Sequence, residues 1–534
     1  MAGFWSMVGL VIKSLITGNE TSGDVTDSAY ENAPGAEPLC LYAIARFGRP
    51  DASTEGGFQP SDPFAEMVAR SLVDVPESNS VMLDQFFSPN PDTVDGFQAM
   101  REAQLNVLNM GRRVDADAIF WGQQNAFGGF DLHLVSDALT SSLYDLMLPL
   151  THSFRQVDHR DVSDALRILL AAQLLFKSRG GEQRLLQIAR LTSYLEDFQE
   201  RINRGEYFEA GGQGVATAYA FGAFVLTETG DRSYCASALR VLEPHIRKIL
   251  SDAGDSPGDV PQAKARSSSG LLGEALPQQK GVAVVRELRT EDLVAQISDF
   301  ARVDAKSTAL LAMYAGLVNW SLIANLKARS PALAIGIWKM LERRFELSLG
   351  SPVDRALAIC KLAEAMVASG KDSEDAKMIE SGAAQYRRAL TMVNNRAHAP
   401  LYAITAYGLA EAIVSAAIIN DVTIPDTQVV PVFQAALKIC ARRDNPYIWG
   451  RTMFALSTVY LTNGTVHKDV QMLSSARMGF SQSYEAFMDA GAKGAARAAS
   501  GGFTRTENII SQLGHRKAIM DATGGEGPEK EIAS

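Results

Sequence analysis

The spacing of hydrophobic and polar residues predicts a small sheet near the start of the chain. Leu39–Phe47 is an almost wholly apolar run, and Val81–Phe86 is a shorter one. Ala116–Trp121 leads into a Gly-rich turn, after which apolar and polar residues alternate over Phe130–Leu134. Such runs are typical of strands, and stretches of helical periodicity separate the first three. The expected order is therefore strand, helix, strand, helix, strand, strand, with at least one face of the sheet covered.

From about residue 160 onward the periodicity is helical, with apolar residues recurring every three or four positions. A stretch rich in Ser, Gly, Pro and Ala interrupts these helices after residue 250. The length of 534 residues also predicts more than one domain. The predicted division is 1–36 amphipathic helix and flexible tether, 37–150 small α/β domain, 151–250 helical domain of degenerate repeats, 251–284 disordered linker, 285–491 helical repeats and 492–534 flexible tail with one short helix.

The second helical block contains a repeat. Three segments align, SPVDRALAICKLAEAMVAS, APLYAITAYGLAEAIVSAA and NPYIWGRTMFALSTVYLTN, and their prolines Pro352, Pro400 and Pro446 lie 48 and 46 residues apart. Another amphipathic segment precedes each proline. A proline suits the first turn of a helix, where its missing N–H costs no hydrogen bond. One helix pair cannot bury both of its faces, so we expect neighbouring pairs to stack.

The repeat resembles the tetratricopeptide class in a long-period form found in bacterial proteins. The resemblance covers residues 330–490. The matching residues are Tyr386, Ala389, Leu390, Ala436, Leu437, Arg443, Asp444, Pro446 and Trp449. The middle repeat lacks the tryptophan. The resemblance implies a tetratricopeptide-like α-solenoid that binds proteins or peptides, and it implies no chemistry.

Residues 39–135 resemble a second known module. A long helix leads to the phrase ADAIFWG, and a Gly turn then precedes the alternating run GFDLHLV. This arrangement is similar to the TolB-type amino-terminal α/β domain, which often precedes repeat domains in bacterial proteins. The resemblance implies a role in assembly or interaction, often at the cell envelope, and no catalytic residues. The predicted fold class is therefore mainly α, with a small α/β amino-terminal domain followed by an α-solenoid.

Charge and cysteine usage narrow the class of partner. The net charge of −10 disfavours a general affinity for nucleic acid. The four cysteines lie far apart in the sequence and form no Cys-x-x-Cys pair, which is typical of free thiols in a reducing cytoplasm. We therefore expect a cytoplasmic protein, with a second possibility at the inner face of the membrane.

The amino-terminal stretch GFWSMVGLVIKSLI leaves three interpretations open. It is too short to span a bilayer and lacks the basic start of a secretory signal. A helix docked on the protein or on a partner through Phe4 and Trp5 is the first interpretation. An interfacial membrane helix is the second, although Lys13 is its only cation. An atypical signal or anchor is the third.

Glycines and histidines between residues 130 and 215 are candidates for chemistry. Gly211, Gly212 and Gly214 precede a helix without the Lys-Ser or Lys-Thr of a phosphate-binding loop, so close helix packing is expected. His152 and His159 lie near two aspartates without metal-binding spacing. They are therefore interpreted as polar surface. His133 is expected to point outward from its strand.

Two carboxylates recur within the repeat. Glu364 and Glu411 both belong to the phrase Leu-Ala-Glu-Ala. A recurring position in a repeat indicates a structural role rather than acid–base work. No pattern in the sequence predicts a catalytic residue, a metal site or a cofactor.

These observations predict a non-enzymatic scaffold or adaptor that binds protein or peptide partners and self-associates into a homo-oligomer. The concave face of the repeats would bury aromatic and aliphatic anchors of the partner. The candidate partner-binding residues are Tyr402, Tyr407, Tyr447 and Trp449, together with Phe4 and Trp5.

Two alternatives stay open. One is an enzyme or a small-ligand sensor for a nucleotide or metal, with its site near Asp158, His159 and Gly211–Gly214. The other is a membrane-attached assembly factor that makes peripheral contact through the amino-terminal helix.

Overall fold

The computed structural model describes most of the chain between residues 40 and 522. Predictions for residues 1–36, including Phe4 and Trp5, lie outside the described residues, as do those for the linker beyond residue 254. The described ranges are 40–47, 62–72, 78–90, 92–93, 96–125, 129–136, 150–154, 159–178, 181–204, 213–227, 229–254, 305–323, 331–347, 352–443 and 445–522.

A five-stranded mixed sheet lies near the amino terminus. Its order is β2 (Ser78–Phe86), β1 (Cys40–Arg46), β3 (Ala118–Gln124), β4 (Phe130–Ser136) and β5 (His152–Phe154). β1 pairs in parallel with β2 and β3, whereas β3, β4 and β5 pair antiparallel. The four predicted strands are confirmed. β5 was not predicted, because three residues between polar neighbours carry too little alternation to stand out.

Two helices make the crossovers that the parallel strands require. α2 (Pro63–Leu72) follows β1, and α3 (Gly96–Arg113) follows β2. The carboxylate of Asp62 accepts hydrogen bonds from the backbone N–H groups of Phe64 and Ala65, both at 3.1 Å. Asp62 thus caps the start of α2, and Pro63 suits its first turn.

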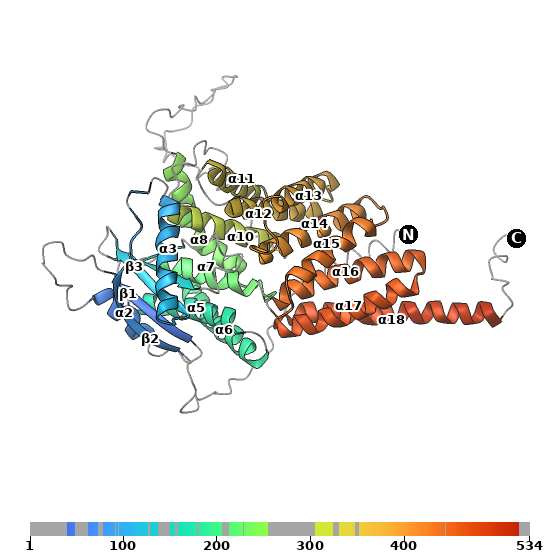
Figure 1. Ribbon diagram of the computed structural model, residues 1–534, viewed down its shortest axis with the longest axis horizontal. Helices are drawn as coiled ribbons and strands as arrows, with labels where there is room; N and C mark the ends of the chain where they lie inside the picture. The colour runs from blue at the N-terminus through green and yellow to red at the C-terminus, as the bar shows by residue number, and fades with distance from the viewer. Residues whose placement is uncertain are drawn as a thin grey trace, which may run out of the picture.

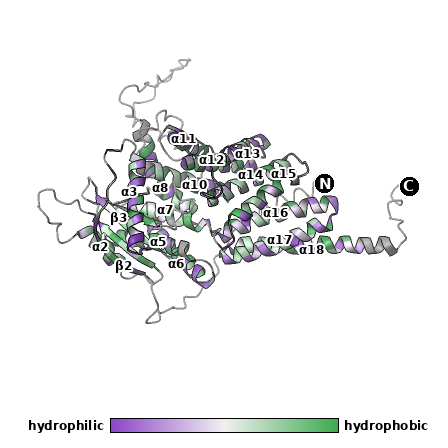
Figure 2. Ribbon diagram, in the orientation of Figure 1, coloured by the Kyte–Doolittle hydropathy of each residue, from purple (hydrophilic) through white to green (hydrophobic). Residues whose placement is uncertain are grey.

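Four helices continue the apolar core away from the sheet. They are α5 (His159–Lys177), α6 (Gly181–Asn203), α7 (Gln213–Thr227) and α8 (Cys235–Gly254), and all four were predicted. From Gly214 to Thr227 every residue of α7 is buried, because α5, α6, α8 and β5 surround it. Figure 2 shows hydrophobic segments that run from the sheet into these helices.

The remaining described helices pack in chain order, each against the next. α10, α12, α14, α16 and α18 also contact one another in succession, so they form a layer, which we call the inner layer. α11, α13, α15 and α17 pack against it. The bounds are α10 (Ala305–Ile323), α11 (Pro331–Leu347), α12 (Pro352–Asp372), α13 (Ala376–Leu390), α14 (Ala399–Ile419), α15 (Asp426–Ile439), α16 (Pro446–His467), α17 (Val470–Asp489) and α18 (Lys493–Ala522). The prediction of a mainly helical protein with a small amino-terminal sheet is confirmed.

The repeat prolines begin their helices as predicted. Pro352 and Pro446 are the first residues of α12 and α16, and Pro400 is the second residue of α14. Asn445 caps α16, because its side chain accepts a hydrogen bond from the backbone N–H of Ile448 at 3.0 Å.

The carboxyl-terminal region differs from the prediction of a flexible tail. Residues 493–522 form α18, which runs along α17 and extends past its end in Figure 1. Small residues explain the error: Ala496, Ala499 and Gly502 lie on the buried face and let α18 approach α17 closely. A Cβ atom at residue 502 would lie 2.7 Å from the ring of Phe480. The same small residues that suggest disorder in the sequence are required here by close packing.

The sheet and the helical repeats share one core. Phe97 of α3 stacks edge-on against Phe345 of α11, with ring centroids 5.5 Å apart. Arg101 of α3 forms an ion pair with Asp354 of α12, whose side chain is buried. The expected separate amino-terminal module is thus joined directly to the first repeat by an aromatic contact and a buried charge pair.

Two histidine predictions are wrong. His133 and His152 are both buried, although surface positions were expected. β5 covers the edge of β4, and Trp121 stacks on the His133 ring at 4.4 Å between centroids. Burial, followed by the proximity of His133, lowers the pKa of His152 to about 3, so its ring is neutral at physiological pH.

One described helix is long and apolar enough to cross a membrane by length and composition. It is α14, with a mean hydropathy of 1.6 over the tested window, of which 61% is buried inside the protein. A central core helix has the same properties, and α14 is enclosed by α12, α13, α15 and α16.

A close approach between α13 and α14 provides a test of the packing. A methyl group at Gly408 would overlap the ring of Tyr386, which is buried. We expect Gly408→Ala to lower the free energy of unfolding by about 1–3 kcal/mol in urea denaturation. The matched control is Gly501→Ala, since Gly501 has open space around it in α18. There we expect a gain of about 0.5–1 kcal/mol from helix propensity. Equal effects of the two substitutions would contradict this packing.

Candidate functional site

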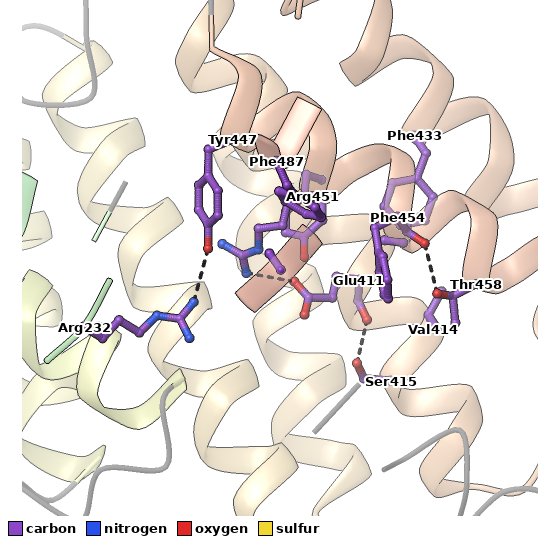
Figure 3. Close-up of a pocket in the computed structure, with 13 residues that line it drawn as sticks. Arg232, Glu411, Val414, Ser415, Phe433, Tyr447, Arg451, Phe454, Thr458 and Phe487 are labelled. Atoms are coloured by element: carbon purple, nitrogen blue, oxygen red, sulfur yellow. Dashed lines mark hydrogen bonds and ion pairs between the residues drawn. The ribbon is translucent and has the colours of Figure 1, made fainter. Parts of the chain in front are cut away.

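A cavity lies between α14, α16 and the segment that precedes α8. Its volume is about 60 Å³. Its polar lining consists mainly of Arg232, Tyr407, Glu411, Tyr447 and Arg451. Its apolar lining consists mainly of Val414, Phe433, Phe454, Ala455 and Phe487. Figure 3 shows labelled side chains of α14 and α16 converging with Arg232, which comes from a much earlier part of the chain.

Helical spacing explains how two helices supply most of the lining. On α14, Tyr407, Glu411 and Val414 are four and three residues apart, so they share one face. On α16, the same spacing places Tyr447, Arg451 and Phe454 on one face. Each helix therefore contributes an aromatic ring, a charged group and an apolar side chain in the same order.

Glu411 is the carboxylate of the cavity and has two cationic neighbours. The Nζ atom of Lys371, near the end of α12, lies 2.6 Å from one carboxylate oxygen, and a guanidinium nitrogen of Arg451 lies 3.7 Å from the other. Burial opposes ionisation of Glu411, but Lys371 and Arg451 outweigh it and lower its pKa to about 2. Glu411 is therefore ionised at neutral pH and is unsuited to donate a proton there.

Arg451 lies over the ring of Tyr407. The guanidinium carbon is 4.8 Å from the ring centroid, within the range of a cation–π contact. Burial raises the pKa of the Tyr407 hydroxyl well above its usual value, so the phenol is neutral. Although burial opposes its charge, the ionised Glu411 raises the pKa of Arg451, which stays cationic.

Trp320 of α10 has three cations near its ring. Arg232, Lys361 and Arg451 lie at 5.0, 6.0 and 5.7 Å from its centroid. Lys361 is also 2.8 Å from Glu364, the repeat equivalent of Glu411. The charged groups therefore extend from the cavity along the inner layer of helices.

Both repeated glutamates lie in ion pairs between or within helices. Glu364 accepts a hydrogen bond from Asn319 at 3.3 Å in addition to its contact with Lys361. Glu411 bridges α12 to α16 through its two cations. Their recurrence in the repeat phrase thus corresponds to recurring charge pairs at the inner layer.

The structure brings together two of the four predicted partner-binding residues in the described region. Tyr407 and Tyr447 line the cavity. Tyr402 and Trp449 are half-buried and lie outside its lining.

The charged residues that line the cavity were not among the predicted partner-binding residues. Arg232 comes from a different helical block, and no spacing in the sequence links it to α16. Arg451 could have been found, because it is one helical turn from the predicted Tyr447.

The alternative site near the α/β domain is only partly described. Asp158, Gly211 and Gly212 lie outside the described residues, and His159 is the first residue of α5. Gly214 lies against Phe154, where an added Cβ would be 2.8 Å from the ring. Gly222 of the same helix lies equally close to Ile168 of α5. The expected close packing at Gly214 is therefore confirmed, although its neighbour Phe154 belongs to the strand β5 and not to a helix. Within the described ranges, no group of three or more His, Cys, Asp or Glu residues could hold a metal ion.

Comparison with protein-family models, characterised proteins and solved structures finds no match to this chain. The resemblances to the tetratricopeptide class and to the TolB-type domain therefore stay predictions from the residues that carry them. The cavity itself combines two arginines, a carboxylate and aromatic walls.

The ionised state of Glu411 predicts a pH dependence of stability. The folded pKa of about 2 lies below the usual value of 4.5, so the stabilisation is present above pH 4.5 and is lost as the pH falls toward 2. We expect Glu411→Gln to cost on the order of 2–3 kcal/mol at pH 7 and progressively less below pH 4.5. Chemical denaturation at several pH values measures this difference.

The matched control for this prediction is Glu485→Gln. Glu485 pairs with Arg442 at 2.9 Å, but its side chain is 57% exposed. An exposed ion pair contributes little, so we expect a small effect at every pH. A loss for Glu411→Gln that stays constant from pH 7 to pH 3 would contradict the assigned charge state.

Proposed function

We propose that this protein is a non-enzymatic scaffold or adaptor that binds protein or peptide partners through a helical repeat array. The observation that carries the proposal is the partly exposed cavity of arginines and aromatic rings at the inner layer of the array. Arginine and the aromatic residues are enriched in protein interfaces, and arginine and tyrosine are among those that contribute most to binding.

We infer that α10–α17 form an α-solenoid of the tetratricopeptide type. The neighbour-to-neighbour packing of these helices supports it, as does the recurrence of proline at the start of α12, α14 and α16. In such arrays each repeat contacts its neighbours, and the inner layer offers a continuous surface to a ligand. The cavity lies where two helices of this layer, α14 and α16, meet.

Self-association is the second part of the proposal. α17 exposes Val470, Met478, Tyr484 and Met488 on one side, and the Met478 side chain is 61% exposed. These positions fall within one stripe of a 3.6-residue helix. Polar residues such as Ser474 and Ser481 lie between them. Exposed apolar side chains of this kind on an outer helix suit contact with a second copy of the chain.

Site-specific photo-crosslinking in the native cell tests both parts of this proposal. We expect a benzoylphenylalanine at residue 455, a half-buried position of the cavity lining on α16, to capture a partner protein. At residue 478 on α17, we expect it to join two copies of the chain. The control position is residue 105, because Leu105 is also exposed but lies on α3, beside the sheet.

The crosslinked products are resolved by electrophoresis and mass spectrometry. Equal labelling at residues 455 and 105 would contradict partner binding through the array. Absence of a dimer from residue 478 would contradict self-association through α17.

A further inference from the structure

We propose that the turn between α7 and α8, residues 229–234, holds the partner site of the array closed, and that a partner reaches the cavity when this turn separates from α16. This inference rests on the proposed function and describes how the site is regulated.

The aromatic lining of the cavity is out of reach of a partner protein. Tyr447 and Tyr407 are 5% and 9% exposed, and Phe433, Phe454 and Phe487 are buried more deeply. A water molecule needs about 10–15 Å³ of such space, so the 60 Å³ between these side chains holds roughly four to six groups of that size. One aliphatic side chain fits this space, but the backbone that would carry it does not. Contact with these rings therefore requires that one wall of the cavity moves.

The turn forms one of these walls through Arg232 and Gly230. The guanidinium carbon of Arg232 lies 5.0 Å from the ring centroid of Trp320, and one of its nitrogens lies 3.5 Å from the hydroxyl of Tyr447. Figure 3 shows the Arg232 side chain reaching from its own segment toward Tyr447. A Cβ atom at Gly230 would lie 3.3 Å from the Tyr447 ring and 3.5 Å from the Cβ atom of Ala492. The turn thus contacts both the start of α16 and the connection between α17 and α18.

Hydrogen bonds within its own helical block shape the turn. The backbone N–H of Gly230 donates to the carbonyl of Thr227 at 3.1 Å. The hydroxyl of Tyr234 donates to the carboxylate of Glu196, on α6, at 3.2 Å. Gly230 has a φ angle of +89°, which glycine adopts without strain. These interactions do not involve the array, so the turn can keep its shape when it separates from α16.

The wall that α14 forms is held more firmly than the turn. Glu411 of α14 forms an ion pair with Lys371 of α12 at 2.6 Å. By contrast, the 3.5 Å contact between Arg232 and Tyr447 is long for a hydrogen bond, and Gly230 has no side chain to interlock with α16. We therefore expect the turn to separate more readily than α14. The closed turn then lowers the apparent affinity for a partner in proportion to the fraction of molecules that are open.

A disulfide between residues 230 and 492 tests this inference. The full-length protein carries Gly230→Cys, Ala492→Cys and benzoylphenylalanine at residue 455. The two Cβ atoms would lie 3.5 Å apart, which suits a disulfide, and the four native cysteines are buried. The protein, oxidised or reduced, is irradiated in a lysate of the native cell. We expect the reduced form to capture a partner at least fivefold more strongly than the oxidised form.

The reduced form is the matched control, because it carries the same substitutions as the oxidised form. The parent protein with benzoylphenylalanine at residue 455, irradiated with and without reductant, controls for the reductant itself. Equal capture by the oxidised and reduced forms would overturn the inference.

Thiol labelling measures the closure without a partner. In a protein with Ala455→Cys, we expect Arg232→Gln to raise the rate of modification by fluorescein maleimide at least threefold, because it removes contacts of the turn with the array. The control is Val466→Cys, since Val466 is 50% exposed and lies near the other end of α16. There we expect no effect of Arg232→Gln. Melting temperatures from circular dichroism show that each variant is folded. An unchanged rate at residue 455 in a folded protein would overturn the inference.

The outcomes separate this inference from the proposed function. If the oxidised and reduced forms capture the same partner equally, the closure by the turn fails and the scaffold proposal stands. If no form of the protein captures a partner at residue 455, the scaffold proposal fails. The labelling rates then decide on the closure alone: a threefold rise supports it, and an unchanged rate overturns it.

Discussion

The inner layer of helices is organised around a set of charges that cannot be separated without cost. Lys371 on α12, Glu411 on α14 and Arg451 on α16 connect three successive helices of this layer. Because these groups are largely removed from water, separating them would leave a buried charge without its counter-charge. The cavity lies beside this network: Glu411 and Arg451 belong to its lining, and Lys371 compensates Glu411 from outside the lining.

The surrounding fold holds these helices at fixed spacing. Close contacts such as that between Gly408 and Tyr386 fix the distance between α13 and α14. In the same way, α18 packs on α17 through small residues. At the other end, the Arg101–Asp354 pair joins the sheet to α12. A segment from an earlier helical block reaches the cavity through Arg232, so the site depends on contacts that are remote in sequence.

The helices, four of the five strands of the sheet and the helix starts at the repeat prolines could be predicted, because each leaves a local pattern in the sequence. The short strand β5 was not predicted, because three residues are too few to show a periodicity. The burial of His133 and His152 was not predicted for the same reason. α18 was mistaken for a tail because small residues signal both disorder and close packing. Tyr407 and Tyr447 could be predicted as aromatic positions of a repeat. Arg232 could not, because only tertiary structure brings it to α16.

A double-mutant cycle on Lys371 and Glu411 tests the central claim most directly. The single variants Lys371→Met and Glu411→Gln and the double variant are compared with the parent protein by chemical denaturation at pH 7. The contact between α12 and α14 predicts a coupling free energy of about 1–3 kcal/mol. A coupling below about 0.3 kcal/mol, as found for independent sites, would show that the two residues do not act together and would contradict this account of the cavity.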